Sequence, residues 1–597
     1  MLIWMLTCTA FADEPADYIA QVEANLENGS LNLTFDEREF SQTVIRRRSL
    51  GSSDGWTQAE VVAELGEVSS WTDTDALPGE VWEYKISRSG DGSATGYITA
   101  AFEAELVDDR GEAVLIIDSA IEPGLSAELA QLRWDLVGDG WTLSEHIVDS
   151  NDAPEEIRAI LQEENNPKAV ILIGHVPVPY SGEIYPDGHS NHQGAWPADT
   201  YYADLNGIWT DQSVNNTSAS REANHNTPGD GRFDQSAIPS NLELQVGRID
   251  MVNLPTFAED ELTLLKRYFR KNHAWRHGEV EAEHAVVIDD GFGVYAPGSF
   301  TGWLLSPVVG RDALIADDFL STLTVAPYLF GYGSGAGTYS SASGVATTSD
   351  FASQPTLGVF LMIFGSYHGD WDSEDNLLRA SIAGEGNAIS SVWGGRPAHQ
   401  HHALGSGQTI GFAVKNTQNS YESISNMDFA ARGIHTALLG DPTLHAFPVS
   451  PAQSLSASSA DDYGSVLLTW SPSSDPDILG YHIYRSSEAM GPYDRITAAP
   501  VSDTIFTDEL PAEGSWWWML RGVKLETTPS GAFYNASQGI FTNIEVECSE
   551  ADCVLIEEDE PESNSKGSSC GHIRSSSNGG SLALMTIFLL CRRKYID

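Results

Sequence analysis

The chain contains very little cysteine. Its 597 residues include five cysteines, and none of them lies between residues 9 and 547. The body of the protein therefore has no cysteine nucleophile, zinc–thiolate site or iron–sulfur cluster. Cys548 and Cys553 are close enough in sequence for a small disulfide loop in an oxidising compartment, or they are two free thiols of a tail.

Positive charge is also scarce. There are 32 Lys and Arg residues against 85 Asp and Glu residues, which gives a formal charge of −53. Nucleic acid is therefore excluded as a partner, because a polyanion would be repelled. An acidic balance is typical of soluble extracellular proteins and of proteins that bind cations. The length predicts three or four structural units, and the sequence does not specify an oligomeric state.

The two ends of the chain carry only short apolar segments. Residues 1–12 end in an A-x-A sequence and resemble a secretory signal peptide. Residues 546–581 form an acidic and Ser/Gly-rich linker that we expect to be disordered. Residues 582–597 hold an apolar stretch too short to span a bilayer, followed by basic residues. The order of Cys570, small residues, apolar stretch and basic end resembles bacterial sorting tails of the MYXO-CTERM kind. This resemblance implies a secreted protein retained at the cell surface, and frayed ends are the alternative.

Strands and helices alternate from Glu112 onward. Apolar runs predict strands over 113–117, 141–147, 169–173, 285–288, 328–332, 359–364 and 388–393, and amphipathic patterns predict helices over 125–136, 153–164 and 259–272. Such alternation indicates an α/β unit with a parallel sheet and flanking helices.

One of these runs has features of a central strand with a site at its end. Val359–Phe364 is unbroken and apolar, and it stops in the sequence GSYHGD. A run of this kind is typical of a strand buried on both faces. Chemistry in open α/β sheets lies just past the carboxyl ends of such strands. Ser366 and His368 are therefore expected where a nucleophile and its neighbour would stand.

Two other regions are expected to be rich in strands. Residues 13–111 contain short alternating segments separated by Gly, Ser and Asp. Residues 452–545 contain strand-like segments at the spacing of a β-sandwich. The second region resembles a fibronectin type III module, with Trp470 as its core tryptophan. Modules of that kind are usually spacers or binding surfaces.

A long polar insertion, Tyr180–Ser240, interrupts the α/β unit. Insertions of this length are usually functional or disordered. Oxygen ligands of the kind that Ca²⁺ prefers stand among its glycine turns, namely Asp199, Asp204, Asn206, Asp211, Asp230 and Asp234. A structural Ca²⁺ site is one prediction for this segment. The other is a solvated acidic loop with Asx-turns.

The unit 112–449 resembles the gingipain family of cysteine peptidases, which have a caspase-like fold. The resemblance is carried, in order, by the segments AVILIGHVPVPY, ADTYYADLNGIW, LELQVGRID, FGYGSGAG, VFLMIFGSYHGDWD and ALLGDPTLHAFPV. It implies a secreted peptidase that acts on polypeptides and has a caspase-like parallel sheet. A β-sandwich after the peptidase unit also suits the family.

Both catalytic positions implied by the resemblance are altered. Ser366 stands three residues before Gly369-Asp370, where the family has its cysteine, and Ala336 stands between two glycines, where the family has its histidine. A serine hydroxyl is not ionised at neutral pH and needs a positioned base. Loss of one or both catalytic partners usually lowers the rate by orders of magnitude. These changes predict a degenerate, weakly active or inactive peptidase homologue.

Two alternatives remain open from the residues. In the first, Ser366 is the nucleophile of a hydrolase whose histidine comes from elsewhere. His399, His401 and His402 are candidates because they follow the strand 388–393, and they could instead bind a transition metal or simply pack. For Asp350 and Asp370, the sequence gives no positional reason to expect either of them as the base for Ser366. In the second alternative, the chain is a non-catalytic surface protein that binds a polymer or another surface protein.

Overall fold

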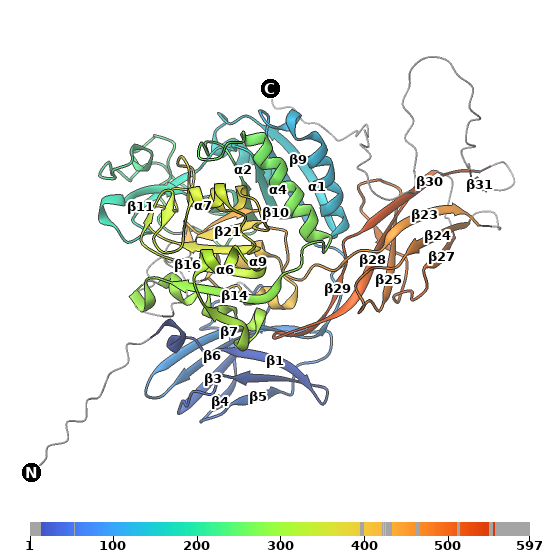
Figure 1. The fold of residues 1–597 in the computed structure, drawn as a ribbon, viewed down its shortest axis with the longest axis horizontal. Helices are drawn as coiled ribbons and strands as arrows, with labels where there is room; N and C mark the ends of the chain where they lie inside the picture. Colours follow the sequence, from blue (N-terminus) through green and yellow to red (C-terminus); the bar gives the residue numbers. More distant parts are fainter. Residues whose placement is uncertain are drawn as a thin grey trace, which may run out of the picture.

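A computed structural model describes residues 14–52, 54–295, 297–393, 399–420, 422, 424, 433–460, 465–509, 514–548 and 553–555. The expected signal peptide, most of the linker and the sorting tail lie outside these residues. Within the described ranges, no helix has both the length and the apolar character needed to cross a membrane. The described chain is a mixed α/β protein with several sheets, in which a central α/β part contacts one β-rich part from each end of the sequence (Figure 1).

The central part is built on a ten-stranded sheet with the order β15-β14-β16-β20-β21-β22-β13-β10-β8-β9. In this order the strands span Leu314–Ala316, Glu283–Asp290, Tyr328–Ser334, Phe360–Phe364, Ser390–Trp393, Ala437–Gly440, Gln245–Ile249, Pro167–Ile173, Gly111–Asp118 and Trp141–Val148. The pairs from β15 to β21 and from β13 to β9 are parallel, and β22 is antiparallel to β21. Most neighbouring strands are therefore parallel, as expected, but the sheet is mixed because it contains an antiparallel pair near its middle.

Both faces of this sheet are covered, which explains the unbroken apolar runs. In β8, Leu115 and Ile117 belong to a core shared with α1 and α4, whereas Val114 and Ile116 belong to a second core on the opposite face, shared with α2 and α3. Successive strand residues point to opposite faces, so a strand buried on both sides must be apolar throughout. The helices are α1 Ser126–Gly138, α2 Pro154–Glu163, α3 Thr200–Ala203, α4 Glu261–Arg276, α5 Ser306–Val309, α6 Phe319–Leu323, α7 Thr348–Ser353, α8 Leu377–Ala383 and α9 Ile410–Asn419.

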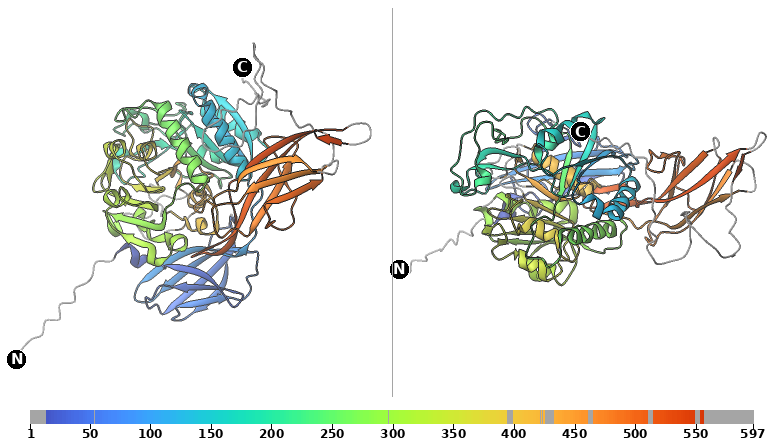
Figure 2. Two further views of the ribbon diagram at one scale, coloured as in Figure 1. Left: turned by 45° about the vertical axis from the view of Figure 1, so that its right-hand side comes forward. Right: turned by 90° about the horizontal axis from the view of Figure 1, so that it is seen from above.

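The insertion after β10 is a folded lobe of the central part. The hairpin of β11 (Tyr180–Ile184) and β12 (Gly194–Pro197) begins it, and α3 follows. Tyr201 stacks on Phe233 at a ring separation of 4.2 Å, and Trp209 meets both rings edge-on. These aromatic contacts give the lobe an apolar core of its own. Seen from above, the lobe extends from one end of the central part (Figure 2).

The N-terminal part is rich in strands, as expected. It contains β1 Val22–Glu27, β2 Ser30–Phe35, β3 Gln42–Ser49, β4 Glu60–Leu65, β5 Ser70–Asp73, β6 Val81–Ser89 and β7 Ser93–Ala104. A sheet with the order β1-β2-β5 and the run β7-β6-β3-β4 share a core that includes Leu33, Ile45 and Tyr84.

The C-terminal part is a β-sandwich, also as expected. It contains β23 Gln453–Ser459, β24 Ser465–Ser471, β25 Gly480–Ser486, β26 Asp494–Arg495, β27 Ile505–Glu509, β28 Gly514–Thr528, β29 Gly531–Ala536, β30 Ile540–Cys548 and β31 Cys553–Leu555. The sheets β23-β24-β27 and β26-β25-β28-β30 enclose Trp470, Tyr481 and Trp518. Cys548 and Cys553 are paired across the β30–β31 ladder, and a small disulfide loop and two free thiols both stay predictions.

One connection was not expected from the sequence. β29 pairs in parallel with β7, so strands from the two ends of the chain form one continuous sheet. Gly531 lies at this junction with a φ of 99°, and a Cβ there would sit 2.1 Å from the carbonyl oxygen of Ala101. The close approach therefore requires a glycine. Residues 13–111 and 452–545 were expected to be separate units, and the structure joins them through this ladder.

Candidate functional site

Ser366 lies at the carboxyl end of a central strand, as the sequence predicted. All five residues of β20 are buried between β16 and β21, and Ser366 follows two residues later with a partly exposed side chain. Tyr367 has a φ of 69°, which is costly for a residue with a large side chain. This tight turn after the strand presents the hydroxyl of Ser366 at the edge of the sheet.

A histidine from the insertion meets this hydroxyl. The Nε2 atom of His189 lies 2.7 Å from the Oγ atom of Ser366. His189 is exposed, and its ring is roughly parallel to that of Tyr367, with centroids 6.4 Å apart. The distance is that of a hydrogen bond, and the serine hydroxyl donates in it when the proton of the ring is on Nδ1. The structure thus supplies Ser366 with a neighbour that can accept its proton.

A buried carboxylate holds the segment that carries His189. Asp187 accepts hydrogen bonds from the backbone N–H of His189 at 3.1 Å and from the backbone N–H of Tyr367 at 3.3 Å. It also contacts the Nδ1 atom of His192, whose ring lies 3.7 Å from that of Tyr367. Asp187 therefore ties the insertion to the turn after β20. Within the described residues the Nδ1 atom of His189 has no hydrogen-bond partner, so the carboxylate orients the backbone of His189 and not its ring.

The loop around Ala336 lies against Ser366. Ala336 itself is exposed, and its carbonyl accepts a hydrogen bond from the backbone N–H of Ser343 at 2.9 Å. A Cβ at Gly337 would lie 2.3 Å from the carbonyl oxygen and 2.5 Å from the backbone nitrogen of Ser366. Only a residue without a side chain allows this approach. The two altered positions are therefore neighbours in space, although Ala336 brings no group that can take up a proton.

His368 does not join this group. It is fully buried, and its Nε2 atom lies 3.0 Å from the carbonyl oxygen of Ser341. Burial lowers the pKa of His368 to about 4, so the ring is neutral at physiological pH. Gly365 leaves room for this ring, because a Cβ there would lie 2.5 Å from the Cε1 atom of His368. We conclude that His368 supports, from beneath the turn, the small sheet of β17 (Gly337–Thr338), β18 (Ser341–Ala342) and β19 (Ala346–Thr347).

An ion-pair network fastens the insertion over the site. Arg221 donates to Asp370 and to Asp372, each at 2.9 Å, and Asn224 donates to Asp370 at 2.6 Å. Tyr180 also donates to Asp372. Burial raises the pKa of Asp370 to about 7, although Arg221 and Asn224 act in the opposite direction. Asp370 thus has a structural role that its sequence position did not reveal.

The histidines expected as alternative bases are elsewhere. His402 contacts Glu83 of the N-terminal part at 2.7 Å, and His399 and His401 stack on each other at 5.0 Å. All three are buried, and burial lowers the pKa values of His399 and His401. Of the three roles that the sequence left open for these histidines, the structure shows packing, because their loop lies against the N-terminal part.

The six Ca²⁺ candidates are not gathered around one point in the described residues. Asp199 pairs with the buried guanidinium of Arg248, and Asp234 accepts three backbone N–H groups. The other four also bond locally: Asp204 with Trp209 and Ser240, Asn206 with Glu243, Asp211 with the backbone N–H groups of Gly229 and Gly231, and Asp230 with Thr227 and Arg232. Among the described residues the group able to hold a metal is a different one, Asp135, His273 and His277. The oxygen atoms of the aspartates are thus occupied by local donors, whereas Asn206 donates to Glu243 through its amide nitrogen. Ca²⁺ binding by this segment stays a prediction.

His189 was missed in the sequence for a physical reason. It lies 177 residues before Ser366. Its position depends on how the insertion folds. The ion pairs of Arg221 with Asp370 and Asp372 connect the insertion to the turn after β20. The motif that holds it, Asp187-x-His189 with His192 one turn later, shows no periodicity that marks a strand or helix. The nearest available signal was a short run of two histidines and an aspartate, Asp187, His189 and His192, inside a long insertion.

Comparisons with known proteins give only partial likenesses. No family model and no curated protein matches the chain. Among solved structures, an Fn3-like protein from Clostridium thermocellum is 21% identical and covers 15% of this chain and 94% of its own, with a TM-score of 0.13. A human fibronectin type III domain, from the KIAA0970 protein, is 19% identical and covers 19% and 88%, with a TM-score of 0.15. Pectate lyase PelI from Erwinia chrysanthemi is 19% identical and covers 15% and 27%, with a TM-score of 0.12.

Proposed function

We propose that the chain is a secreted or surface-retained hydrolase in which Ser366 is the nucleophile and His189 is the general base. The observation that carries this proposal is the 2.7 Å separation of the serine Oγ and the histidine Nε2 atoms. Nucleophile and base within hydrogen-bond reach at the end of a central strand are the arrangement that serine-based catalysis needs. The partial exposure of Ser366 and the exposure of His189 leave both groups open to a substrate.

The chemistry follows from these two groups. Nε2 of His189 takes the hydroxyl proton as Oγ of Ser366 attacks a carbonyl carbon, which forms a tetrahedral oxyanion. The protonated imidazole then gives its proton to the leaving group, and an acyl-enzyme remains. Water, deprotonated by the same imidazole, hydrolyses that ester. We propose the backbone N–H of Ser366, which makes no hydrogen bond to another described residue, as a donor to this oxyanion.

The substrate class rests on the resemblance to gingipains. We propose a caspase-like fold for residues 112–449 and a polypeptide as the substrate, because the family's segments occur here in order. The C-terminal sandwich is then a fibronectin type III-like module. A signal peptide and a sorting tail would place the enzyme on the bacterial cell surface. Its catalytic centre differs from that of the family, because the imidazole comes from the insertion and not from the loop of Ala336.

A fluorophosphonate probe tests this function directly. Such probes react with an activated serine, and we expect one adduct per folded chain, located on Ser366 by peptide mass mapping. Ser366→Ala should abolish the adduct, and Ser340→Ala, a partly exposed serine in the neighbouring hairpin, should leave it unchanged. Thiol-directed inhibitors should have no effect, because the body of the chain has no cysteine.

One observation favours a second candidate, a non-catalytic surface-binding protein descended from a peptidase. Among the described residues, no carboxylate hydrogen-bonds the Nδ1 atom of His189, whereas efficient triads orient the imidazole through that nitrogen. If folded protein with an intact Ser366–His189 contact gives no adduct and cleaves no polypeptide, this second function replaces the first.

A further inference from the structure

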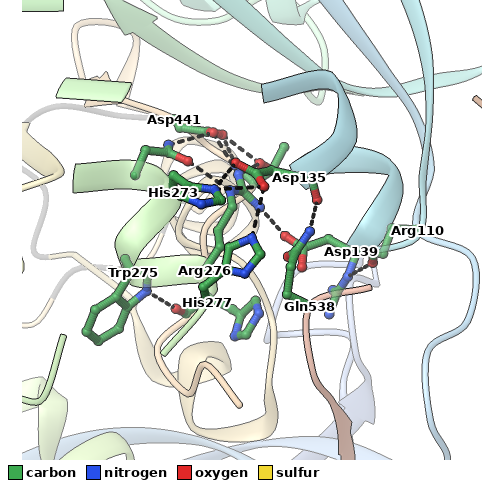
Figure 3. A network of polar contacts seen from close by, with 12 residues as sticks. Arg110, Asp135, Asp139, His273, Trp275, Arg276, His277, Asp441 and Gln538 are labelled. Atoms are coloured by element: carbon green, nitrogen blue, oxygen red, sulfur yellow. Dashed lines mark hydrogen bonds and ion pairs between the residues drawn. The ribbon is translucent and has the colours of Figure 1, made fainter. Parts of the chain in front are cut away.

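A cluster of histidine and carboxylate side chains lies between two helices, apart from Ser366. His273 is in the last turn of α4 and His277 caps that helix, one turn later on the same face. Asp135, in α1, points at both rings (Figure 3). Its Oδ2 atom is 3.0 Å from Nδ1 of His273, and its Oδ1 atom is 3.1 Å from Nε2 of His277. We propose that these three side chains bind a transition metal ion, with Zn²⁺ as the best fit.

The ligand set suits this class of ion. The two imidazole nitrogens are borderline donors that favour Zn²⁺ over Ca²⁺ or Mg²⁺, and Zn²⁺ also accepts a carboxylate oxygen as a further ligand. In a tetrahedral zinc site with bonds of about 2.0–2.1 Å, neighbouring ligand atoms lie about 3.3 Å apart. The nitrogen–oxygen separations here are 3.0 and 3.1 Å, and all the ligand atoms lie within 4.8 Å of one another. Small rotations of the rings and carboxylate would therefore give zinc geometry.

The carboxylate is the most deeply placed of the three ligands. The Asp135 side chain is 3% exposed, and those of His273 and His277 are 31% and 18% exposed. The two oxygen atoms of Asp135 face Nδ1 of His273 and Nε2 of His277. A buried anion facing two imidazoles can be satisfied by their N–H groups or by a metal ion that replaces those protons.

Neighbouring groups leave room for the ion and balance nearby charge. A cavity of about 580 Å³ opens beside Asp135 and His273, and polar side chains such as Glu128 and Gln131 line it. It offers space for a water molecule as the fourth ligand. The adjacent cation, Arg276, is engaged by Asp139 and Asp441, so its charge is balanced (Figure 3).

The position of the cluster gives the ion a structural role. The backbone carbonyl of Asp135 accepts a hydrogen bond from Gln538, which lies between β29 and β30, at 2.6 Å. A metal ion held by α1 and α4 would therefore brace the central part next to its contact with the C-terminal sandwich. This site is separate from the Ser366 centre and does not depend on the proposed hydrolase activity.

The test is a metal titration of full-length protein that carries no histidine tag and has been stripped with a chelator. We expect the wild-type chain to bind one Co²⁺ with the visible absorption bands of a tetrahedral site, and Zn²⁺ to displace it. His277→Gln removes one nitrogen ligand but keeps an N–H donor for Asp135, so it should retain the fold. It should lower Zn²⁺ affinity at least tenfold and remove the Zn²⁺-dependent rise in the thermal midpoint.

His146→Gln is the matched control. His146 also contacts a carboxylate, Glu164 at 2.6 Å, and its side chain is 18% exposed like that of His277, but no second histidine from the described part of the chain shares that carboxylate. This variant should bind Co²⁺ and Zn²⁺ as the wild type does. The proposal is overturned if wild type binds no Zn²⁺ at 100-fold molar excess, or if His277→Gln and wild type bind it equally well. The first result would mean that Asp135 is satisfied by imidazole N–H groups alone.

Discussion

Two clusters in this protein use the same residue types but arrange them differently. At the end of β20, the carboxylate of Asp187 bonds the backbone of His189, and the free imidazole nitrogen faces the hydroxyl of Ser366. Between α1 and α4, the carboxylate of Asp135 faces the ring nitrogens of both His273 and His277. The first arrangement leaves a nitrogen able to take a proton from a nucleophile. The second directs two nitrogens and an oxygen at one point, which suits a metal ion.

The difference shows that the role of a histidine depends on what each nitrogen faces. Exposure adds to the contrast, because His189 is open to solvent whereas His277 is mostly covered. A base must be reached by its substrate, and a structural ligand need not be. Changes at each cluster should therefore affect different properties of the protein.

The largest expected contrast is in serine reactivity. His189→Ala removes the proton acceptor, and general-base catalysis is typically worth about 10²–10⁴-fold. We expect the second-order rate constant for fluorophosphonate labelling of Ser366 to fall by this factor. His225→Ala is the control, because His225 lies in the same lobe and contacts the carbonyl of Ala219. Equal labelling of His189→Ala and wild type would show that His189 is a bystander.

The next largest effect concerns the attachment of the lobe that carries His189. Arg221→Ala leaves Asp370 and Asp372 largely buried without their cation, and breaking such a pair costs about 3 kcal/mol. Urea unfolding should show this loss, together with slower labelling of Ser366. Arg232→Ala, which removes a more exposed pair with Asp230, should cost about 0.5 kcal/mol. If both variants are equally stable, Arg221 does not hold the lobe in place.

A smaller effect is expected on the other side of Ser366. Gly337→Ala would place a methyl group against the backbone of Ser366, and overpacking of this kind costs about 2 kcal/mol. Gly66→Ala is the control, because a Cβ there meets nothing within 4 Å and no positive φ is required. We expect a lower midpoint of thermal unfolding for Gly337→Ala than for Gly66→Ala. An unchanged midpoint for Gly337→Ala would mean that the segment around Ala336 can move away freely.

The smallest expected effect concerns the carboxylate of Glu261, which does not have the histidine partners that Asp135 has. Burial, with the charges of Asp250 and Asp118, raises the pKa of Glu261 to about 7, and its Oε1 atom has no hydrogen-bond partner among the described residues. The folded state therefore holds a proton that the unfolded state releases, so this contribution to stability is present below pH 4.5 and is lost as pH rises to about 7.

Glu261→Gln should remove that dependence. Allowing for solvent screening of a partly exposed group, we expect the variant to gain about 1 kcal/mol over wild type at pH 8 and nothing at pH 4. Urea unfolding at the two pH values measures the difference. Glu281→Gln, at an exposed position before β14, should have the same free energy of unfolding as the wild type at both pH values. A gain that is the same at pH 4 and pH 8 would show that Glu261 does not titrate in this range.

The sheet and the position of Ser366 were predictable because they depend on local pattern. Val359–Phe364 is apolar at every position, which only a strand covered on both faces requires, and the turn that follows it is polar. The partners of Ser366 were not predictable. His189 arrives through a lobe whose path is set by Arg221 and two aspartates far away in sequence.

Two of the three side chains of the proposed metal site have a spacing that could be recognised in the sequence. His273 and His277 have the spacing that places two rings on one face of a helix. Asp135 precedes them by more than 130 residues and meets them only because α1 packs on α4. The pairing of β29 with β7 was likewise hidden, because neither strand carries a local signal that names a partner at the other end of the chain.

The pairing of β7 with β29 affects which truncated forms of this protein are useful in an experiment. Cutting the chain before residue 452 would strip a neighbour from β7 and leave its backbone N–H and C=O groups facing water as an open edge. Exposed strand edges pair with strands of other molecules and promote aggregation. A shortened protein that fails to capture a ligand would thus say little about the sandwich as a binding surface. Point substitutions on its outer face, with the full chain kept, are the sound way to ask that question.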